Sequence, residues 1–301
     1  MYSSPKDTHH IQYKGFTFKL DLGEPSEFAK NVARQELRET PENVKNGLSE
    51  LRRLLKDESN LNCPLDNDLW LMSFLRLAHF YPEEALHKIR NYFNYRLKYP
   101  ELFKDLNLKA FEGHLHDYTG SMLPQRDQLG RRLYVGLSGK YWDTQKWKRE
   151  YPLRSFILQC ESLRCEPETQ ICGIVILLDM ENLTIRQSLH YTLGFLKSLI
   201  EYLQDGMGIR LKGYHILNQP KIVNALYTMS KPFIREKFVN RLHFHGSDMA
   251  SLHRHIAPEC LPECYGGTLK AARQSYGPQI YELLKKYEKD RYVFSQYGCS
   301  K

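Results

Sequence analysis

The chain has 301 residues, of which 42% are hydrophobic and 26% are charged, and its formal net charge is +8. This composition excludes wholesale disorder and collagen-like repeats, and the length suffices for one large domain and one small one. The longest apolar stretch, Ile171 to Leu178, is too short to span a bilayer, and residues 1–10 lack a signal-peptide core. We therefore expect a soluble cytoplasmic protein whose seven cysteines are reduced thiols. The positive charge is compatible with nucleic acid or with an anionic membrane, and proves neither.

The first hundred residues predict a small helical domain. Residues 1–26 are expected to form a flexible arm. Thr40 is a good N-cap for a first helix, residues 66–68 can cap a second, and Pro82 opens a third. Residues 27–106 are therefore predicted to be all-helical.

Beyond this domain, strand and helix patterns alternate. Strands are predicted at 132–137, 171–178, 213–217 and 241–245, and helices at 152–165, at 186–204, after Pro220 and again after Pro232. The strand, helix, strand order over 171–217 is a βαβ unit, so its two strands should be parallel. The predicted fold class is α/β, preceded by helices.

No catalytic constellation is evident in the sequence. Residues 136–140 lack the spacer of a phosphate-binding loop, and Gly206 and Gly208 follow a helix, which excludes a dinucleotide fingerprint. Asp179 and Glu181 follow the buried strand, where acids can be catalytic, but we expect them to cap the next helix. We predict no catalytic residues and no enzyme activity.

Histidines and cysteines near the C-terminus form the set that most resembles a metal site. They are His243, His245, His253, His255, Cys260 and Cys264. The two cysteines have a spacing found in zinc sites, but histidines at i and i+2 are expected to split across the faces of a strand. We predict no metal site, and a zinc-dependent enzyme is kept as an alternative that metal analysis of the pure protein would test.

The helix after Pro220 is apolar on two sides. One stripe holds Ile222, Leu226 and Met229, and the other holds Val223 and Tyr227. Such a helix is either simply buried or a lid between an apolar cavity and a membrane. Lys237 and Arg241, expected at i and i+4 on one helical face, would suit anionic lipid headgroups beside such a lid.

A series of motifs in the chain resembles the CRAL-TRIO family, and most closely its tocopherol transfer and cellular retinaldehyde-binding branch. The motifs are Phe74–Phe80, Tyr99–Phe103, Lys212–Pro220, Lys231–Phe233, His245–Gly246 and Leu261–Gly267. The resemblance implies a helical domain at 27–106, a lipid-binding domain at 107–270 with a mixed sheet floor and a helical gate, and a C-terminal helix and tail at 271–301.

By matched position, the resemblance also implies the site residues. The cavity is expected to be lined by Leu153, Phe156, Cys160, Ile174, Leu178, Leu183, Tyr191, Leu199, Tyr202, Leu203, Ile209, Tyr214, Ile222, Val223, Leu226 and Met229. A phosphoinositide headgroup is expected at Arg210, Lys237 and Arg241, with Lys212 close by. The family's fourth basic position falls on Ala78, for which Arg76, Lys212 or Arg235 are the expected substitutes. Asn182 stands where the family often has glycine, and asparagine tolerates the left-handed conformation.

The function implied by the resemblance is non-enzymatic carriage of one hydrophobic molecule of the tocopherol, retinoid or carotenoid kind. The partners would be this ligand and a phosphoinositide-containing membrane, with no nucleic acid and no cofactor besides the lipid. The protein would be a cytoplasmic monomer that associates transiently with membranes. The alternative within the same fold is exchange of phosphatidylinositol or phosphatidylcholine.

Overall fold

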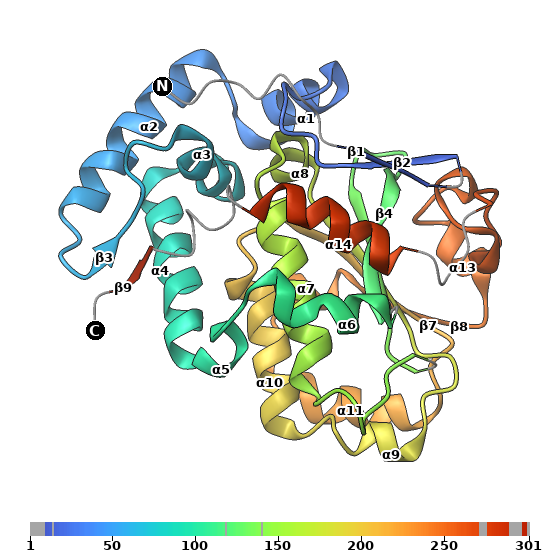
Figure 1. The fold of residues 1–301 in the computed structure, drawn as a ribbon. Coiled ribbons are helices and arrows are strands. Elements are labelled where there is room, and N and C mark those ends of the chain that lie inside the picture. The colour runs from blue at the N-terminus through green and yellow to red at the C-terminus, as the bar shows by residue number, and fades with distance from the viewer. Residues whose placement is uncertain are drawn as a thin grey trace.

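The computed structural model describes residues 10–13, 15–117, 119–139, 141–270, 276–288 and 297–299. A group of N-terminal helices lies beside an α/β part built on a five-stranded sheet (Figure 1). The helices of the first group are α1 (Glu27–Leu37), α2 (Pro41–Lys56), α3 (Asp68–Leu77), α4 (Pro82–Lys98) and α5 (Pro100–Phe103).

The caps predicted for this group are present. The Thr40 hydroxyl accepts a hydrogen bond from the Asn43 amide at 3.1 Å, and Asn67 accepts one from Trp70 at 2.9 Å. Each satisfies a backbone N–H group that a helix start leaves without an intrahelical partner. One prediction is wrong in detail, because the two-residue strand β3 (Leu61–Asn62) lies between α2 and α3 and pairs with β9 (Gly298–Cys299).

The N-terminal segment is not a loose arm over the residues that the structure describes. Strands β1 (His10–Tyr13) and β2 (Phe16–Lys19) form an antiparallel hairpin against α14 (Gly277–Lys286). Phe18 and Leu20 are each only 1% exposed. Alternation along this short stretch buries enough apolar surface to hold it, and the part of the predicted arm that precedes residue 10 lies outside the described residues.

The central sheet has the order β4-β5-β6-β7-β8. Its strands are β4 (Gly120–Arg126), β5 (Arg132–Leu137), β6 (Ile174–Asp179), β7 (Leu211–Leu217) and β8 (Leu242–Gly246). Strand β4 is antiparallel to β5 and the other pairs are parallel, which confirms the mixed α/β class and the parallel βαβ unit. Strand β4 was not predicted. Strand β6 begins three residues later than predicted, because Ile171 and Cys172 end α8 (Pro167–Cys172) and Gly173 then turns the chain at φ 85°.

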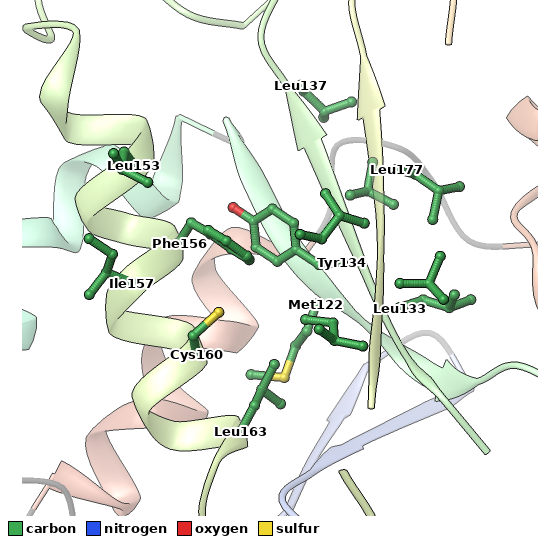
Figure 2. Packing of buried hydrophobic residues seen from close by; sticks show 14 of the residues in the cluster. Met122, Leu133, Tyr134, Leu137, Leu153, Phe156, Ile157, Cys160, Leu163 and Leu177 are labelled. Carbon is green, nitrogen blue, oxygen red and sulfur yellow. The ribbon is translucent and has the colours of Figure 1, made fainter. Parts of the chain in front are cut away.

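The two faces of this sheet are covered differently. The front face, which carries Tyr134, Leu178 and Tyr214, lies under α7 (Glu150–Leu163), α10 (Leu193–Glu201) and α11 (Ile222–Ser230). The back face lies under α13 (Met249–His253), η5 (Glu263–Tyr265) and the start of α14. Figure 2 shows Phe156 of α7 pointing at Tyr134, while Leu133 and Leu177 point away from α7.

The predicted helix 186–204 is broken in the structure. It comprises α9 (Ile185–Ser188), α10, and a π-helical turn η2 (Tyr202–Gly206). Thr184 and Thr192 each cap a new helix start, so the chain restarts instead of continuing. The remaining elements are η1 (Leu108–Phe111), α6 (Glu112–His116), η3 (Lys231–Phe233), α12 (Glu236–Val239) and η4 (Pro258–Cys260).

Buried polar contacts fasten the helical group to the α/β part. Arg76 of α3 donates to Gln170 of α8 at 2.6 Å, and the Tyr92 hydroxyl donates to Glu161 of α7 at 2.9 Å. Tyr95 donates to the Ser198 carbonyl at 2.8 Å. Because these bonds are buried, the two parts hold a fixed relation around the front-face helices.

Candidate lipid cavity and basic cleft

Two adjoining apolar cavities, of about 80 Å³ each, lie on the front face of the sheet. We call them the sheet cavity, beneath α7, and the gate cavity, beneath α11. They share five residues, which are Leu178, Tyr191, Leu199, Leu203 and Tyr214. The sheet cavity is otherwise lined by Thr119, Tyr134, Gly136, Ser138, Trp142, Arg149, Pro152, Leu153, Phe156, Ile176 and Phe195. The gate cavity is otherwise lined by Met180, Leu196, Ile200, Ile216, Val223, Leu226, Tyr227, Ser230, Ile234, Phe238, Leu242 and Phe244.

Strand periodicity explains which residues line these cavities. On β5, β6, β7 and β8 every second side chain points to the front face. The Tyr134 ring meets Phe156 of α7 with ring centroids 4.6 Å apart (Figure 2). At the end of β5, Gly139 comes so close to the loop after β6 that an added Cβ would lie 2.0 Å from the Glu181 carbonyl oxygen. Residues 136–139 therefore form a close-packed strand end.

Most polar side chains that line the cavities carry hydroxyls. Tyr134, Tyr191 and Tyr214 all line the sheet cavity, and burial raises the pKa of each phenol. They therefore stay neutral hydrogen-bonding groups. Arg149 lies on the same cavity, where its Nε donates to Glu150 at 2.8 Å. A site of this kind suits a largely apolar molecule with a hydroxyl or carbonyl.

The predicted lining residues divide into two groups. Those on a cavity wall are Leu153, Phe156, Leu178, Tyr191, Leu199, Leu203, Tyr214, Val223 and Leu226. Those that are buried but line neither cavity are Cys160, Ile174, Leu183 and Tyr202, and Ile209 lines the cleft described below. Alternation along the strands was the available signal for the missed residues Gly136, Ile176, Ile216, Leu242 and Phe244.

Helix α11 buries side chains from both of its apolar stripes and leaves others at the surface. Val223 and Leu226 are buried, whereas Ile222 and Met229 are 39% and 42% exposed and do not line the cavities. The predicted cavity role of Ile222 and Met229 therefore stays a prediction, and in this structure both side chains lie at the surface. On α9 and just after it, Ile185 and Leu189 are still more exposed, at 75% and 74%. Helices α9 and α11 lie at the same end of the molecule (Figure 1).

A basic cleft of about 260 Å³ lies on the other side of η2 and α12. Its charged lining is Lys88, Arg210, Arg235, Lys237, Arg241 and one carboxylate, Asp205. Arg210, Lys237 and Arg241, at which a headgroup was expected, all line this cleft, although α12 ends at Val239 and does not carry Arg241 on its face. Burial and then the neighbouring Arg241 lower the pKa of Lys237, as expected where cations crowd together.

The expected substitutes for the missing fourth cation are otherwise engaged. Arg76 is 7% exposed, lies off the cleft and pairs with Glu39 at 2.7 Å. Lys212 also lies off the cleft lining and pairs with Glu36 at 3.0 Å. Arg235 lines the cleft but forms a bidentate pair with Asp205.

Leu203 and Phe238 line both the gate cavity and the basic cleft. Leu203 belongs to η2 and Phe238 to α12, directly after Lys237. These two side chains separate an apolar space from a cationic one, and we call them the partition.

The back face of the sheet carries a histidine cluster, and the prediction that the histidines of its strand lie on opposite faces is wrong. Residues i and i+2 of a strand share a face, so His243 and His245 lie together on β8. Their rings gather with those of His215 and His255, and His215 Nδ1 lies 2.9 Å from His245 Nε2. Among the described residues no group of three or more His, Cys, Asp or Glu side chains has an arrangement that could hold a metal ion.

Asp179 does not cap the next helix, and neither does Glu181. Thr184 caps α9 in a reciprocal pair with Gln187. Asp179 instead accepts hydrogen bonds from Asn218 and the Tyr265 hydroxyl, both at 3.0 Å, which ties together the ends of β6 and β7 and the covering η5. Asn182 adopts φ 62°, as expected for asparagine in place of glycine.

The fold and site define a class of protein: an α/β domain with an internal apolar cavity beneath a helix, joined to a small helical domain. No helix in the described part of the chain combines the length and the apolar character needed to cross a membrane. Residues 117–267 match the family model described as CRAL/TRIO domain.

Curated relatives agree with this match. Human alpha-tocopherol transfer protein-like is 35% identical over 237 residues, which are 78% of this chain and 69% of that protein. Rat clavesin-1 is 34% identical over 280 residues, covering 89% of this chain and 78% of its own length. A solved structure described as crystal structure of Sfh5 aligns with a TM-score of 0.49 at 15% identity, over 72% of this chain and 84% of that one. By the family model and these sequence relatives, the chain belongs to the CRAL/TRIO family.

Proposed function

We propose that this protein carries one hydrophobic molecule, of the tocopherol, retinoid or carotenoid kind, between membranes without catalysing a reaction. The observation that carries the proposal is the pair of apolar cavities between the sheet and α11, whose polar groups are mostly neutral hydroxyls. Burying an insoluble ligand there contributes about 25 cal/mol per Å² of apolar surface. A relative whose name includes alpha-tocopherol transfer supports the same reading.

Loading requires the cavities to widen. Two spaces of about 80 Å³ are small beside the roughly 300–1,000 Å³ of typical ligand sites. Helix α11 is the part of the wall best suited to move, because it keeps Ile222 and Met229 at the surface and contributes only two large buried apolar side chains. A membrane that binds these exposed side chains would favour the open state by a shift of populations.

The surface features suit a phosphoinositide-containing membrane. The exposed apolar side chains of α9 and α11 can enter the headgroup region, and the basic cleft offers cations that each contribute about 1 kcal/mol near an anionic surface. We accordingly propose a cytoplasmic monomer that associates transiently with membranes and needs no cofactor other than its lipid.

The first test is native mass spectrometry of the purified chain after incubation with a lipid extract from its source. One isoprenoid bound per chain supports the proposal and identifies the cargo. A bound phosphatidylinositol or phosphatidylcholine would replace it with phospholipid exchange, and a chain that stays empty with every extract would contradict both.

The second test separates docking from binding. Lys237→Glu with Arg241→Glu should weaken binding to phosphoinositide vesicles and slow transfer at least tenfold, while ligand affinity stays unchanged. Lys45→Glu with Lys56→Glu on α2, two exposed positions, changes the net charge equally and should leave transfer intact. Normal transfer by the cleft variant would contradict the docking role of the cleft.

A further inference from the structure

His79 lies at the basic cleft among its cations. It follows α3, where its amide donates to the Arg76 carbonyl at 3.3 Å, and its backbone is left-handed at φ 53°. The side chain lines the cleft together with Arg210 and Lys237. His79 belongs to the Phe74–Phe80 motif, but the family's basic position falls on Ala78, so His79 was not predicted as a site residue.

Most cations near His79 already have carboxylate partners. Arg210 pairs with Glu36 at 2.9 Å, Arg235 with Asp205, and Lys88 with Glu84 at 2.8 Å. Within the part of the chain that the structure describes, Lys237 and Arg241 form no ion pair. An anion entering the cleft therefore meets two uncompensated cations and, beside them, an imidazole.

We propose that His79 binds the phosphate of a membrane-lipid headgroup as an imidazolium, so that docking of the protein on phosphoinositides takes up a proton. This inference rests on the proposed function, since it concerns the same docking cleft. His79 supplies the fourth cation, which is missing because position 78 is alanine, and it makes the affinity of the cleft for phosphate depend on pH.

The charges around His79 give the direction of this dependence. Burial is the largest effect that lowers the pKa of His79, followed by the charges of Arg210 and Lys237, while the backbone and carboxylate of Glu36 oppose the shift. Lys88, Arg241 and Asp205 line the same cleft. A phosphate lying between His79 and the cations reverses the local charge and raises this pKa. The bound state then holds more protons than the free state, so binding tightens as the pH falls toward about 6.

Glu36 is the internal competitor of the incoming anion. Its carboxylate accepts from both Arg210 and Lys212, and these cations lower its pKa in spite of its burial. A phosphate that takes Arg210 must displace this carboxylate. Glu36→Gln should therefore tighten vesicle binding severalfold at every pH, without removing the pH dependence that His79 confers.

The closing experiment uses the full chain and vesicles of phosphatidylcholine with and without phosphatidylinositol bisphosphate. Wild type and His79→Asn are compared at about pH 6 and about pH 8, because asparagine is neutral and tolerates the left-handed backbone. The phosphate itself titrates near pH 6, and the ratio between the two proteins cancels that effect. We expect wild type to bind about tenfold more tightly than the variant near pH 6 and about equally near pH 8.

A soluble inositol trisphosphate separates the headgroup from the membrane. Calorimetry in two buffers of different ionisation enthalpy should record proton uptake by wild type that His79→Asn loses, and this must hold with the headgroup alone. A ratio that does not change with pH, or equal proton uptake by both proteins, overturns the role of His79 and leaves the docking proposal standing. Failure of wild type to bind phosphoinositide vesicles at either pH overturns both.

Discussion

The two faces of the central sheet are built from alternate residues of the same strands, yet they have opposite chemistry. On β7, Tyr214 and Ile216 face the cavities, while His215 between them faces a cluster of imidazoles. The front face leaves two cavities of about 80 Å³ each and offers neutral hydroxyls, whereas the back face leaves a space of only about 20 Å³ and is hydrogen-bonded. The contrast teaches that one strand can line a cavity on one face and pack into a hydrogen-bonded layer on the other, because side chains alternate with a period of two.

The largest effect is expected from filling the space where the two front-face cavities meet. Leu178 lies on both cavities, and Leu178→Trp places an indole where they join. We expect ligand affinity to fall at least a hundredfold, measured by fluorescence titration with a retinoid or tocopherol, while binding to phosphoinositide vesicles is retained. Val175→Ile, on the buried back face of the same strand, is the matched control and should keep ligand affinity. Unimpaired loading of the tryptophan variant would show that the cargo binds elsewhere.

The back face is destabilised by removing the Asp179 carboxylate, its main hydrogen-bond acceptor. Asp179→Ala leaves the Tyr265 hydroxyl and the Asn218 amide without this partner in a region where Asp179 is only 2% exposed. The free energy of unfolding should fall by about 3 kcal/mol, measured by urea denaturation. Asp179→Asn keeps one carbonyl acceptor and should recover part of the loss. A variant as stable as wild type would mean that water replaces the carboxylate.

Acid should also weaken the back face. Burial first, and then the neighbouring histidines, lower the pKa of His215 to about 2 and that of His245 to about 4. The charges of Arg131 and Arg254 lower these pKa values further, and Asp248 opposes the shift of His245. Both folded-state values lie below that of a free histidine, so the unfolded chain binds more protons below about pH 6.5 and stability falls as the pH drops.

The expected loss between about pH 7.5 and about pH 5 is about 2 kcal/mol from His215, and His245 adds a further loss. Urea midpoints at the two pH values measure it. His215→Asn should remove about 2 kcal/mol of the difference, whereas the exposed control His87→Asn should keep it all. An acid loss that persists in full after His215→Asn would place its origin outside the cluster.

The smallest effect is expected at the gate end of the front face. Leu189→Glu replaces a side chain that is 74% exposed, so the thermal midpoint should not change. Partition onto anionic vesicles should drop about fivefold, because a charge replaces an apolar group that enters the headgroup region. Leu129→Glu, at an exposed turn on the β4 side, is the matched control. Equal losses in both variants would indicate nonspecific repulsion.

Local signals were enough to predict much of the fold. The helix starts at Thr40 and Asn67 depend on a single side chain and the amides next to it, and the buried strand of β6 depends on a run of β-branched residues. The hairpin β1–β2 was missed because its burial depends on α14, which lies more than 250 residues later in the sequence. The break before α10 was missed because apolar spacing continued through the exposed Leu189.

The site was predictable where it follows strand alternation or a matched position, as at Leu178 and Tyr214. Exposure was not predictable, since the sequence does not say which apolar side chains of α11 meet the sheet and which meet solvent. Ion pairs and cleft contacts between distant segments were not predictable either. That Glu36 engages Arg210, and that His79 joins the cleft, depends on how α1 and α3 pack against the α/β part.

The partition formed by Leu203 and Phe238 gives the two compartments a common boundary only one side chain thick. Movement of that boundary enlarges one compartment at the expense of the other. On the proposed function, a headgroup that draws Lys237 toward itself would move Phe238, its neighbour on the four-residue helix α12, and a cargo that presses on Phe238 would move Lys237. Occupancy of the two compartments would then be antagonistic, and by linkage equally so in both directions. The loaded carrier would bind the membrane less tightly than the empty one, and a docked carrier would hold its cargo less tightly than a free one.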